Sequence, residues 1–458
     1  MTRRLALTLG FSLAASAAAA GAQQAMPPVH PIGPIEHVTT TPMKAVSAVR
    51  ELPGGRVLVN DVVDHRVLLF DSTLANPTAV ADSTSSTANA YGNMPGGLIP
   101  YRGDSTLFID PASLSMLVLD GAGKIARVMS VPHPNEAIFL IGGPFGTSGF
   151  DPAGRLVYRG NTLRMTARAA GKGDQDEMLP QFPDSAPIVR VTLATRAEDT
   201  VAFFKIPPTK MSVRRTGNGG FVATSTINPM PVVDDWALLP DGTVAIVRGR
   251  DFHIDWVHPD GTRASTPKIP FDWQRLTDDE KAAVIDSAKQ VLEKRRADRI
   301  AALTETRTAT SAGTERRVTA SAGGDGGGGA MGGMVMIVRK DGGDGNGGAA
   351  PPTRGGSNAQ ITMPPLQFVP PYELPDYRPA FTAGATTCDL QGNLWIRTSQ
   401  ATDGQPVYDV VNEQGVLVDR VQLPAFRTIA GFGHGVVYMG VTDSTGAVHL
   451  ERARLNRK

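Results

Sequence analysis

The sequence predicts an all-β fold, a six-bladed β-propeller. Residues Glu51 to Asp71, ELPGGRVLVNDVVDHRVLLFD, contain a Gly turn, a short apolar strand, an Asp-rich turn and a second apolar strand. This pattern returns at intervals of about fifty residues. Four short strands in a row are typical of one propeller blade, so the repeat indicates blades that pack on their neighbours.

The first predicted blade has four strands: Lys44 to Glu51, Gly55 to Asp61, His65 to Asp71 and Thr78 to Ala81. The second contains GGLIPY, STLFID, LSMLVLD and KIARVMSV. The third contains DPAGRLVYRG, an insertion from Asn161 to Pro183, and then PIVRVTL and TVAFFKI. The fourth is DDWALLPDGTVAIVRGRDFHIDWVHPDGTR, in which Asp241-Gly242 and Asp260-Gly261 indicate two-residue hairpin turns. The glycines from Gly142 to Gly146 indicate a loop between blades.

The chain ends predict how the ring closes. The fifth blade contains TTCDLQGNLWIRTS, QPVYDVVN and GVLVDRVQLP, whereas the sixth, RTIAGFGHGVVYMGV and AVHLERARL, supplies only three strands. The lone strand Ile35 to Thr41 is the missing fourth. Strands from both ends of the chain would then complete one blade and remove its exposed edges.

An insertion is predicted over residues 276–363, between blades one to four (residues 35–275) and blades five and six (364–458). Thr277 and Glu280 match a capping box, which predicts a charged helix from there to about Ala301. Ser321 to Asn358 is so rich in glycine that it buries too little apolar surface to order, which predicts disorder.

The N-terminus has the features of a secretory signal. Arg3 and Arg4 precede an apolar run from Leu5 to Ala20, and small residues follow, so cleavage near Ala22 is expected, with a Pro-rich leader over 23–34. The mature chain would be periplasmic or secreted. It would carry 43 Lys and Arg against 44 Asp and Glu, a balance that disfavours nucleic acid as a partner. No later stretch approaches a membrane span.

Local catalytic motifs are missing from the sequence. It contains no GxSxG turn and no HExxH helix, which leaves the standard serine-hydrolase and zinc-peptidase mechanisms without support. Cys388 is the single cysteine, so no internal disulfide can form. Its position in a predicted strand favours a buried, inert thiol over a reactive one.

The units ELPGGRVLVNDVVDHRVLLFD, DPAGRLVYRG, LPDGTVAIVRG and DLQGNLWIRTS resemble six-bladed propellers of the NHL and TolB-like kind, most closely the exported bacterial ones. The resemblance covers Ile35 to Leu455 apart from the insertion. Related folds include sugar-lactone hydrolases and streptogramin lyases, whose catalysis depends on a metal in the central channel. No Glu, Asn and Asp set stands in matching context here.

Aligning the units on their Gly turns indicates a ring of candidate ligand-binding residues at the ends of the second strands. Asn60, Asp110, Arg159, Arg397 and Gly440 take one quasi-equivalent position, and Arg248 falls one residue beyond it. Guanidinium groups there would suit a carboxylate or phosphate on a small molecule. The alternative is that these residues are strand ends joined by salt bridges between blades.

Two acidic clusters are weaker candidates. Asp61, Asp64 and His65 share a turn that could ligate a cation, although Asp-rich turns more often cap backbone amides. Asp251, His253 and Asp255 alternate with Phe252, Ile254 and Trp256. They could form a metal site or a general-base pair, although a structural role is favoured for them as well.

The leading functional hypothesis is therefore an exported propeller that binds a small ligand or an envelope protein at the channel mouth, without evident catalysis or an identified cofactor. The first alternative is a hydrolase or lyase of the lactonase kind, which would require a divalent metal in the channel. The second is a cell-envelope scaffold that makes contact through the helix and the Gly-rich arm.

Overall fold

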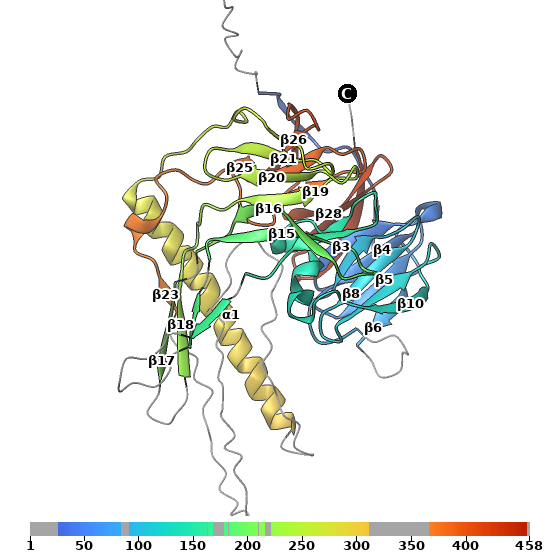
Figure 1. Ribbon diagram of the computed structural model, residues 1–458, viewed down its shortest axis with the longest axis horizontal. Helices are drawn as coiled ribbons and strands as arrows, with labels where there is room; N and C mark the ends of the chain where they lie inside the picture. Colours follow the sequence, from blue (N-terminus) through green and yellow to red (C-terminus); the bar gives the residue numbers. More distant parts are fainter. Residues whose placement is uncertain are drawn as a thin grey trace, which may run out of the picture.

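The computed structural model describes residues 26–83, 91–162, 164–167, 178–181, 183–208, 210–215, 221–310 and 366–455. Within these ranges the chain forms a six-bladed propeller with an attached helix and small sheet (Figure 1). The predicted signal peptide and the Gly-rich segment Ser321 to Asn358 lie outside the described residues.

Blades 1 to 3 follow the predicted units, with strands given from the inside outward. Blade 1 contains β3 (Val46–Glu51), β4 (Val57–Asp61), β5 (Arg66–Phe70) and β6 (Thr78–Asp82). Blade 2 contains β7 (Gly97–Pro100), β8 (Thr106–Asp110), β9 (Ser115–Leu119) and β10 (Ile125–Ser130). Blade 3 contains β11 (Gly149–Phe150), β12 (Leu156–Arg159), β15 (Ser185–Val191) and β16 (Glu198–Lys205).

Blade 4 contains β19 (Asp235–Leu238), β20 (Val244–Arg248), β21 (His253–Val257) and β22 (Arg263–Ser265). Blade 5 contains β24 (Thr386–Cys388), β25 (Leu394–Thr402), β26 (Gln405–Val411), β27 (Leu417–Gln422) and, from the N-terminus, β1 (Val29–Pro31). Blade 6 contains β28 (Arg427–Gly433), β29 (Val436–Thr442), β30 (Val448–Arg454) and β2 (Ile35–Val38).

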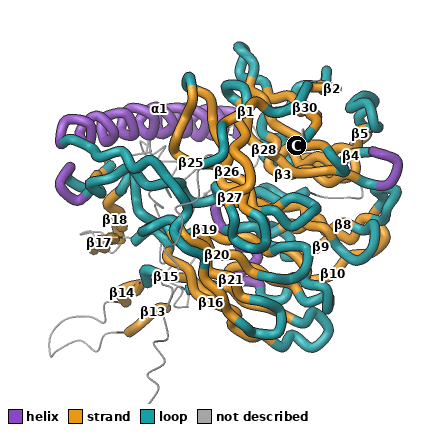
Figure 2. The backbone as a smooth tube through the Cα atoms, turned by 90° about the horizontal axis from the view of Figure 1, so that it is seen from above, coloured by secondary structure: helices purple, strands orange, loops and turns teal. Residues whose placement is uncertain are grey.

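The predicted closure of the ring is confirmed. Strand β2 pairs antiparallel with β30, with Ile35 opposite Ala453 and Val38 opposite Glu451. The Pro-rich leader contributes more than the sequence suggested, because β1 pairs in parallel with β27 at the edge of blade 5 (Figure 2). Proline tolerates such an edge position, since Pro31 has no N–H to donate.

The core consists of apolar clusters in the interfaces between neighbouring blades. Because successive side chains of a strand point to opposite faces, each strand serves two interfaces. In β4, Val57 and Val59 pack toward blade 6, whereas Leu58 packs toward blade 2. The predicted alternation in β21 is confirmed in the same way: Phe252 and Ile254 are fully buried and Trp256 is nearly so.

The two Asp-Gly hairpins of blade 4 are confirmed, with one difference in the turn. Gly242 donates its N–H to the Leu239 carbonyl, and Gly261 donates to the His258 carbonyl. Each Gly is therefore the last residue of a four-residue turn, at a φ of +88° and +87° respectively. The positive φ favours glycine. The Asp241 and Asp260 carboxylates accept from the amides of the threonines two residues later, Thr243 and Thr262.

Helix α1 (Asp278–Thr310) begins at the predicted capping box and runs past the predicted end at Ala301. Thr277 Oγ1 accepts from the Glu280 amide, and the Glu280 carboxylate accepts from the Thr277 amide at 2.7 Å. None of the helices in the described part of the chain combines the length and apolar character that a membrane span requires.

Two hairpins inserted beside the blades were not predicted. The first, β13 (Arg164–Ala167) with β14 (Met178–Gln181), lies within the insertion of blade 3. The second, β17 (Lys210–Arg215) with β18 (Phe221–Ile227), gains a parallel third strand, β23 (Gln367–Phe368). Figure 1 shows α1 and this small sheet together outside the blades. Residues after β23 join them, because Val369 and Leu374 pack with Val284 and Ile285 of α1.

Short 3-10 helices complete the connections. They are η1 (Pro53–Gly55), η2 (Pro134–Ile141), η3 (Gly143–Phe145) and η4 (Pro371–Glu373). Helices η2 and η3 form the connection between blades 2 and 3, which confirms that the glycines from Gly142 to Gly146 belong to a loop between blades.

Candidate functional site

The candidate residues do not all share one position. Asn60, Arg159, Arg397 and Gly440 lie on the same strand faces as Leu58, Val157, Trp395 and Tyr438, whose side chains pack toward the next blade. Asp110 instead matches Asp61 as the last residue of its second strand, opposite Ser115 as Asp61 is opposite Arg66. The alignment on Gly turns was thus one residue off for Asp110. Because a one-residue shift in a strand reverses the face of a side chain, Asp110 points to the opposite face from Asn60 and Arg159.

The acidic and amide members of the set are buried and already hydrogen-bonded within the fold. Asn60 donates to Ser47 Oγ and to the Gly96 carbonyl, both at 2.8 Å, and accepts from the Tyr91 hydroxyl. Asp61 accepts from the amides of Lys44 and Ala45 and from Arg66. These contacts hold strands and loops in place, and a ligand-binding role for these two residues stays a prediction.

Asp110 and Arg248 are also bonded to neighbouring groups. Asp110 accepts from the Gly92 and Ala112 amides and from Ser113 Oγ. Arg248 donates to Asp234 and Asp255, each at 2.7 Å, and so ties β20 to its neighbours. Arg248 is therefore salt-bridged, as the alternative interpretation expected, but within blade 4 rather than between blades. Ligand binding by Asp110 or Arg248 remains untested.

Arg159 is different. The residue is only 8% exposed, yet the described residues supply its guanidinium group with neither an ion pair nor a hydrogen bond. Its buried Nε atom has no partner. Burial lowers its pKa from the usual value of 12.5 to about 10. A buried charge without a counter-ion is costly, so this guanidinium stands out as a group that lacks a partner of opposite charge.

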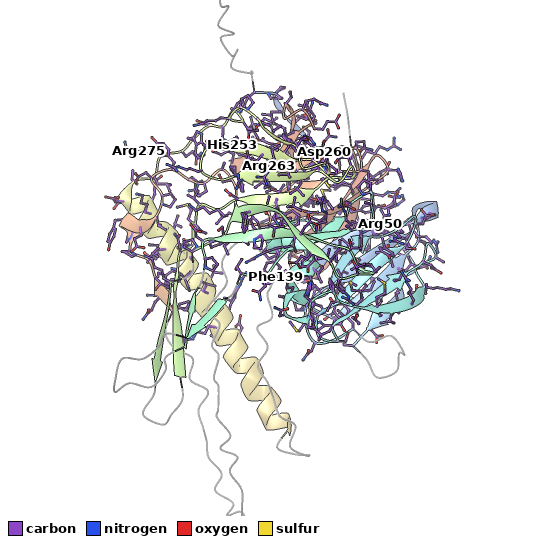
Figure 3. All side chains as sticks on the ribbon, viewed as in Figure 1. Arg50, Phe139, His253, Asp260, Arg263 and Arg275 are labelled. Atoms are coloured by element: carbon purple, nitrogen blue, oxygen red, sulfur yellow. The ribbon has the colours of Figure 1, made fainter. Side chains whose placement is uncertain are left out.

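Three phenyl rings surround the Arg159 guanidinium, a group we call the Arg159 cage. The Arg159 Cζ atom lies 4.7 Å from the centre of the Phe139 ring, 5.3 Å from Phe145 and 6.0 Å from Phe204. The faces of aromatic rings attract cations, which partly offsets the cost of burial. Phe139 lies near the middle of the molecule, between the green and the blue blades (Figure 3).

The elements that form the cage come from distant parts of the chain. Arg159 ends β12, Phe204 lies on β16 of the same blade, and Phe139 and Phe145 lie on η2 and η3. Because Arg159 is opposite Ile188, which is in turn opposite Ala202, Arg159 and Phe204 point to the same face of blade 3.

The loop after η3 anchors the cage to the innermost strands. The Phe145 carbonyl accepts from Trp236 Nε1 at 2.9 Å, and Thr147 Oγ1 donates to the Thr386 carbonyl at 3.0 Å. Gly146 must remain glycine, since a Cβ there would lie 2.1 Å from Trp236 Nε1. The loop thus reaches the inner strands of blades 4 and 5.

Arg397 is exposed at the equivalent position of blade 5. Within the described residues, no side-chain hydrogen bond or ion pair joins any two of the candidates Asn60, Asp61, Asp110, Arg159, Arg248 and Arg397. The structure therefore does not connect the predicted arginines to one another. Among the candidate arginines, Arg159 alone is both buried and without an ion pair to the described residues.

The two acidic clusters have structural partners. Asp64 pairs with Lys44 and Arg66. The Asp61 carboxylate caps backbone amides, as expected, but they are those of Lys44 and Ala45 rather than those of its own turn.

In blade 4, His253 Nδ1 lies 2.7 Å from Asp251, and Nε2 lies 3.3 Å from Asp255. Both ring nitrogens of this histidine therefore already face carboxylates.

The Cys388 thiol donates to the Leu238 carbonyl at 3.2 Å, and burial raises its pKa to about 12. Because the thiolate is the reactive form, this environment supports the inert thiol predicted from sequence.

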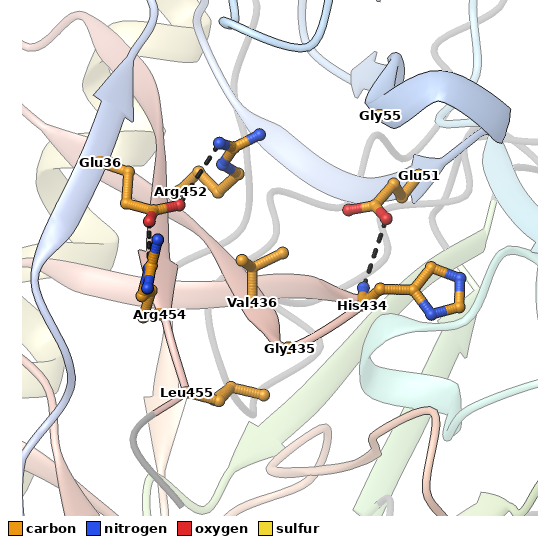
Figure 4. Close-up of a pocket in the computed structure, with 9 residues that line it drawn as sticks. All are labelled: Glu36, Glu51, Gly55, His434, Gly435, Val436, Arg452, Arg454 and Leu455. Atoms are coloured by element: carbon orange, nitrogen blue, oxygen red, sulfur yellow. Dashed lines mark hydrogen bonds and ion pairs between the residues drawn. The ribbon is translucent and has the colours of Figure 1, made fainter.

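A cavity of about 490 Å³ lies between blades 6 and 1 (Figure 4). Its acidic side chains already have partners: Glu36 pairs with Arg452 and Arg454, and Glu51 accepts from the Tyr438 hydroxyl at 2.7 Å. The His434 ring points away from Glu51 in Figure 4, and only its backbone N–H reaches that carboxylate. This pairing makes the cavity a weaker candidate than the Arg159 cage.

Comparisons with known proteins give fold likeness alone. No family model matches the sequence, and no curated protein sequence matches it. Virginiamycin B lyase from Staphylococcus aureus is 9% identical with a TM-score of 0.36, and the match covers 92% of this chain and 97% of that one. A streptogramin B lyase structure is 9% identical, with a TM-score of 0.32 and coverage of 92% and 87%.

The luciferin-regenerating enzyme is 11% identical, with a TM-score of 0.34 and 92% of each chain covered. At such values the likeness carries no argument about chemistry. The six-bladed architecture rests on the strand pairing of the structure itself.

Proposed function

We propose that this protein is an exported six-bladed propeller that binds a small anionic ligand beside the channel, through Arg159, and does not convert it. The observation that carries the proposal is the buried Arg159 guanidinium, which has no counter-ion among the described residues. A carboxylate or phosphate on a ligand would supply both the missing charge and the missing hydrogen-bond acceptors.

The surroundings of Arg159 favour a ligand with a flat apolar body. Phe139 and Phe145 are half-buried, so part of each ring remains open to solvent. A planar aromatic acid could place its ring against these phenyl rings and its carboxylate against the guanidinium. Aromatic carboxylates are therefore the first class of ligand to examine.

Benzoate serves as the probe, and the neutral benzamide is its matched control. Isothermal titration calorimetry of the full chain should detect benzoate binding, with benzamide weaker by on the order of tenfold because it lacks the charge. Arg159→Gln should remove benzoate binding, whereas Arg397→Gln, at the equivalent exposed position, should retain it. Inorganic phosphate competes in the same titration if the site accepts any small anion.

Three outcomes would contradict the proposal: equal binding of benzoate and benzamide, benzoate binding unaffected by Arg159→Gln, or no binding of benzoate and phosphate at all. A further control concerns acids of the chain itself. Asp174, Asp176 and Glu177 lie outside the described residues. If neutralising these three residues creates benzoate binding that the unaltered chain lacks, Arg159 is paired internally and the site is not a ligand site.

The export step has its own test. The apolar run from Leu5 to Ala20 supports secretion, and mass spectrometry of the mature protein should find an N-terminus near residue 23.

The metal-dependent hydrolase remains the competing function. It requires a divalent ion in the channel, and loss of a turnover activity on chelation, with the fold intact, would favour it over simple binding. The envelope-scaffold hypothesis predicts loss of partners when residues 321–358 are deleted.

A further inference from the structure

One imidazole and two carboxylates converge between the outer strands of blades 2 and 3. They are His133, which follows β10, Glu136 on η2 and Glu198 at the start of β16, and one ligand atom from each lies within 4.8 Å of the others. Among the described residues this is the one group of three such side chains that comes so close. The sequence did not indicate it, because Glu198 is sixty-two residues from Glu136.

The Nε2 atom of His133 faces one of the two carboxylates. It is screened from solvent and lies 3.1 Å from Glu198 Oε2, in ion-pair contact but without hydrogen-bond geometry. In a tetrahedral zinc site with bonds of about 2.0–2.2 Å, neighbouring ligand atoms are about 3.3–3.5 Å apart. This pair already has nearly that spacing, and the Glu198 side chain is 35% exposed, so it has room to move closer to Glu136.

Glu136 is held in place by other groups. It is 8% exposed, and it accepts from the Tyr158 hydroxyl at 2.6 Å and from the Asn161 amide at 2.8 Å. Each of its oxygens keeps a further lone pair for a cation. Hydrogen bonds of this kind orient the carboxylate ligands of metal sites.

The local charge favours a cation. Glu136 and Glu198 bring two carboxylates together beside the His133 ring. Arg196 lies nearby, but it donates to the Val131 carbonyl and to Ser130 Oγ rather than to either glutamate. Asp199 adds a further negative charge, partly balanced by its ion pair with Arg190.

We infer that His133, Glu136 and Glu198 form a Zn²⁺ site that joins blade 2 to blade 3. Mixed imidazole and carboxylate ligands suit zinc, whereas calcium and magnesium prefer all-oxygen sites. The ion would link two elements that follow β10, the segment with His133 and helix η2, to strand β16. It would therefore hold η2 against blade 3. The inference is independent of the Arg159 cage and of catalysis.

The test uses untagged full-length protein stripped with EDTA and titrated with ZnCl₂ by calorimetry, with bound zinc counted by elemental analysis. The expected result is one zinc ion per chain and a rise in the melting temperature on binding. His133→Gln and Glu198→Gln should each weaken zinc binding by at least about tenfold. Both side chains are partly exposed, so the melting temperature without zinc should change little.

His253→Gln is the matched control, because His253 also lies between two carboxylates but both its ring nitrogens face them. It should bind zinc like the unaltered chain. The inference is overturned by no stoichiometric zinc binding, by binding that survives His133→Gln, by equal loss in the His253→Gln variant, or by tighter binding of Ca²⁺ than of Zn²⁺. Zinc that persists in the His133→Gln protein would instead place a metal elsewhere, as the hydrolase hypothesis requires.

Discussion

The Arg159 guanidinium lies over the ring of Phe139, with 4.7 Å between Cζ and the ring centre, although Arg159 belongs to a strand of blade 3 and Phe139 to the connection between blades 2 and 3. Arg159 ends the second strand of blade 3, and Phe139 lies on η2, which leads out of blade 2. The pair shows that the connection between blades supplies part of the surroundings of Arg159.

Replacing Arg159 should stabilise the ligand-free protein. Arg159→Met keeps much of the apolar volume and removes a buried charge that has no ion pair among the described residues. We expect the free energy of unfolding to rise by about 1–2 kcal/mol, as measured by urea denaturation. Arg248→Met is the control and should lower it by roughly 2–3 kcal/mol, because Asp234 and Asp255 lose their partner. Equal destabilisation by both variants would contradict the unpaired charge.

Asp235 should make stability fall as the pH rises. It is 2% exposed on the innermost strand of blade 4, and burial raises its pKa from 3.8 to about 7, against the hydrogen bond from the Thr386 amide. A raised pKa in the fold means that the stabilising contribution is complete below about pH 3.8 and is lost as the pH rises through about 7.

Urea denaturation between pH 5 and pH 8 measures this effect as the difference between the unaltered chain and Asp235→Asn. The unaltered chain should lose roughly 2–3 kcal/mol relative to the variant over that range. Subtracting the variant removes the contribution of other titrating groups, such as Asp409, whose pKa burial raises to about 6. Parallel stability curves for the two proteins would refute the prediction.

Removal of β2 should open the ring. Deleting residues 26–40 takes away both β1 and β2, so β30 keeps β29 but loses its outer antiparallel partner and exposes that edge. Deleting residues 26–34 removes β1 alone from the edge of blade 5. Calorimetry should show a much lower melting temperature for the longer deletion than for the shorter one. Similar losses would mean that β2 does not close the propeller.

Cys388 should resist thiol reagents in the folded protein. Its thiol donates to the Leu238 carbonyl, and burial raises its pKa to about 12, so little thiolate exists at pH 8. Ellman's reagent should react slowly with the native chain and release one equivalent in guanidinium chloride. Rapid modification of native protein would contradict this assignment.

Local patterns were sufficient to predict the blades and the capped start of α1. Strand alternation and turn glycines act over a few residues, so LPDGTVAIVRG indicates a hairpin wherever it occurs. Counting strands also predicted the closure by β2. The hairpin β17–β18 was missed because its third strand, β23, lies about 140 residues further along the chain.

Six blades closed by strands from both ends could be predicted without a structure, because each blade has its own periodic signal. The environment of each candidate residue could not, because it depends on tertiary packing. Arg159 and Arg248 look alike as strand-end arginines. The guanidinium of Arg159, however, lies among phenyl rings, whereas that of Arg248 lies between two aspartates. Those neighbours come from other strands and connections, so their meeting depends on how the blades pack.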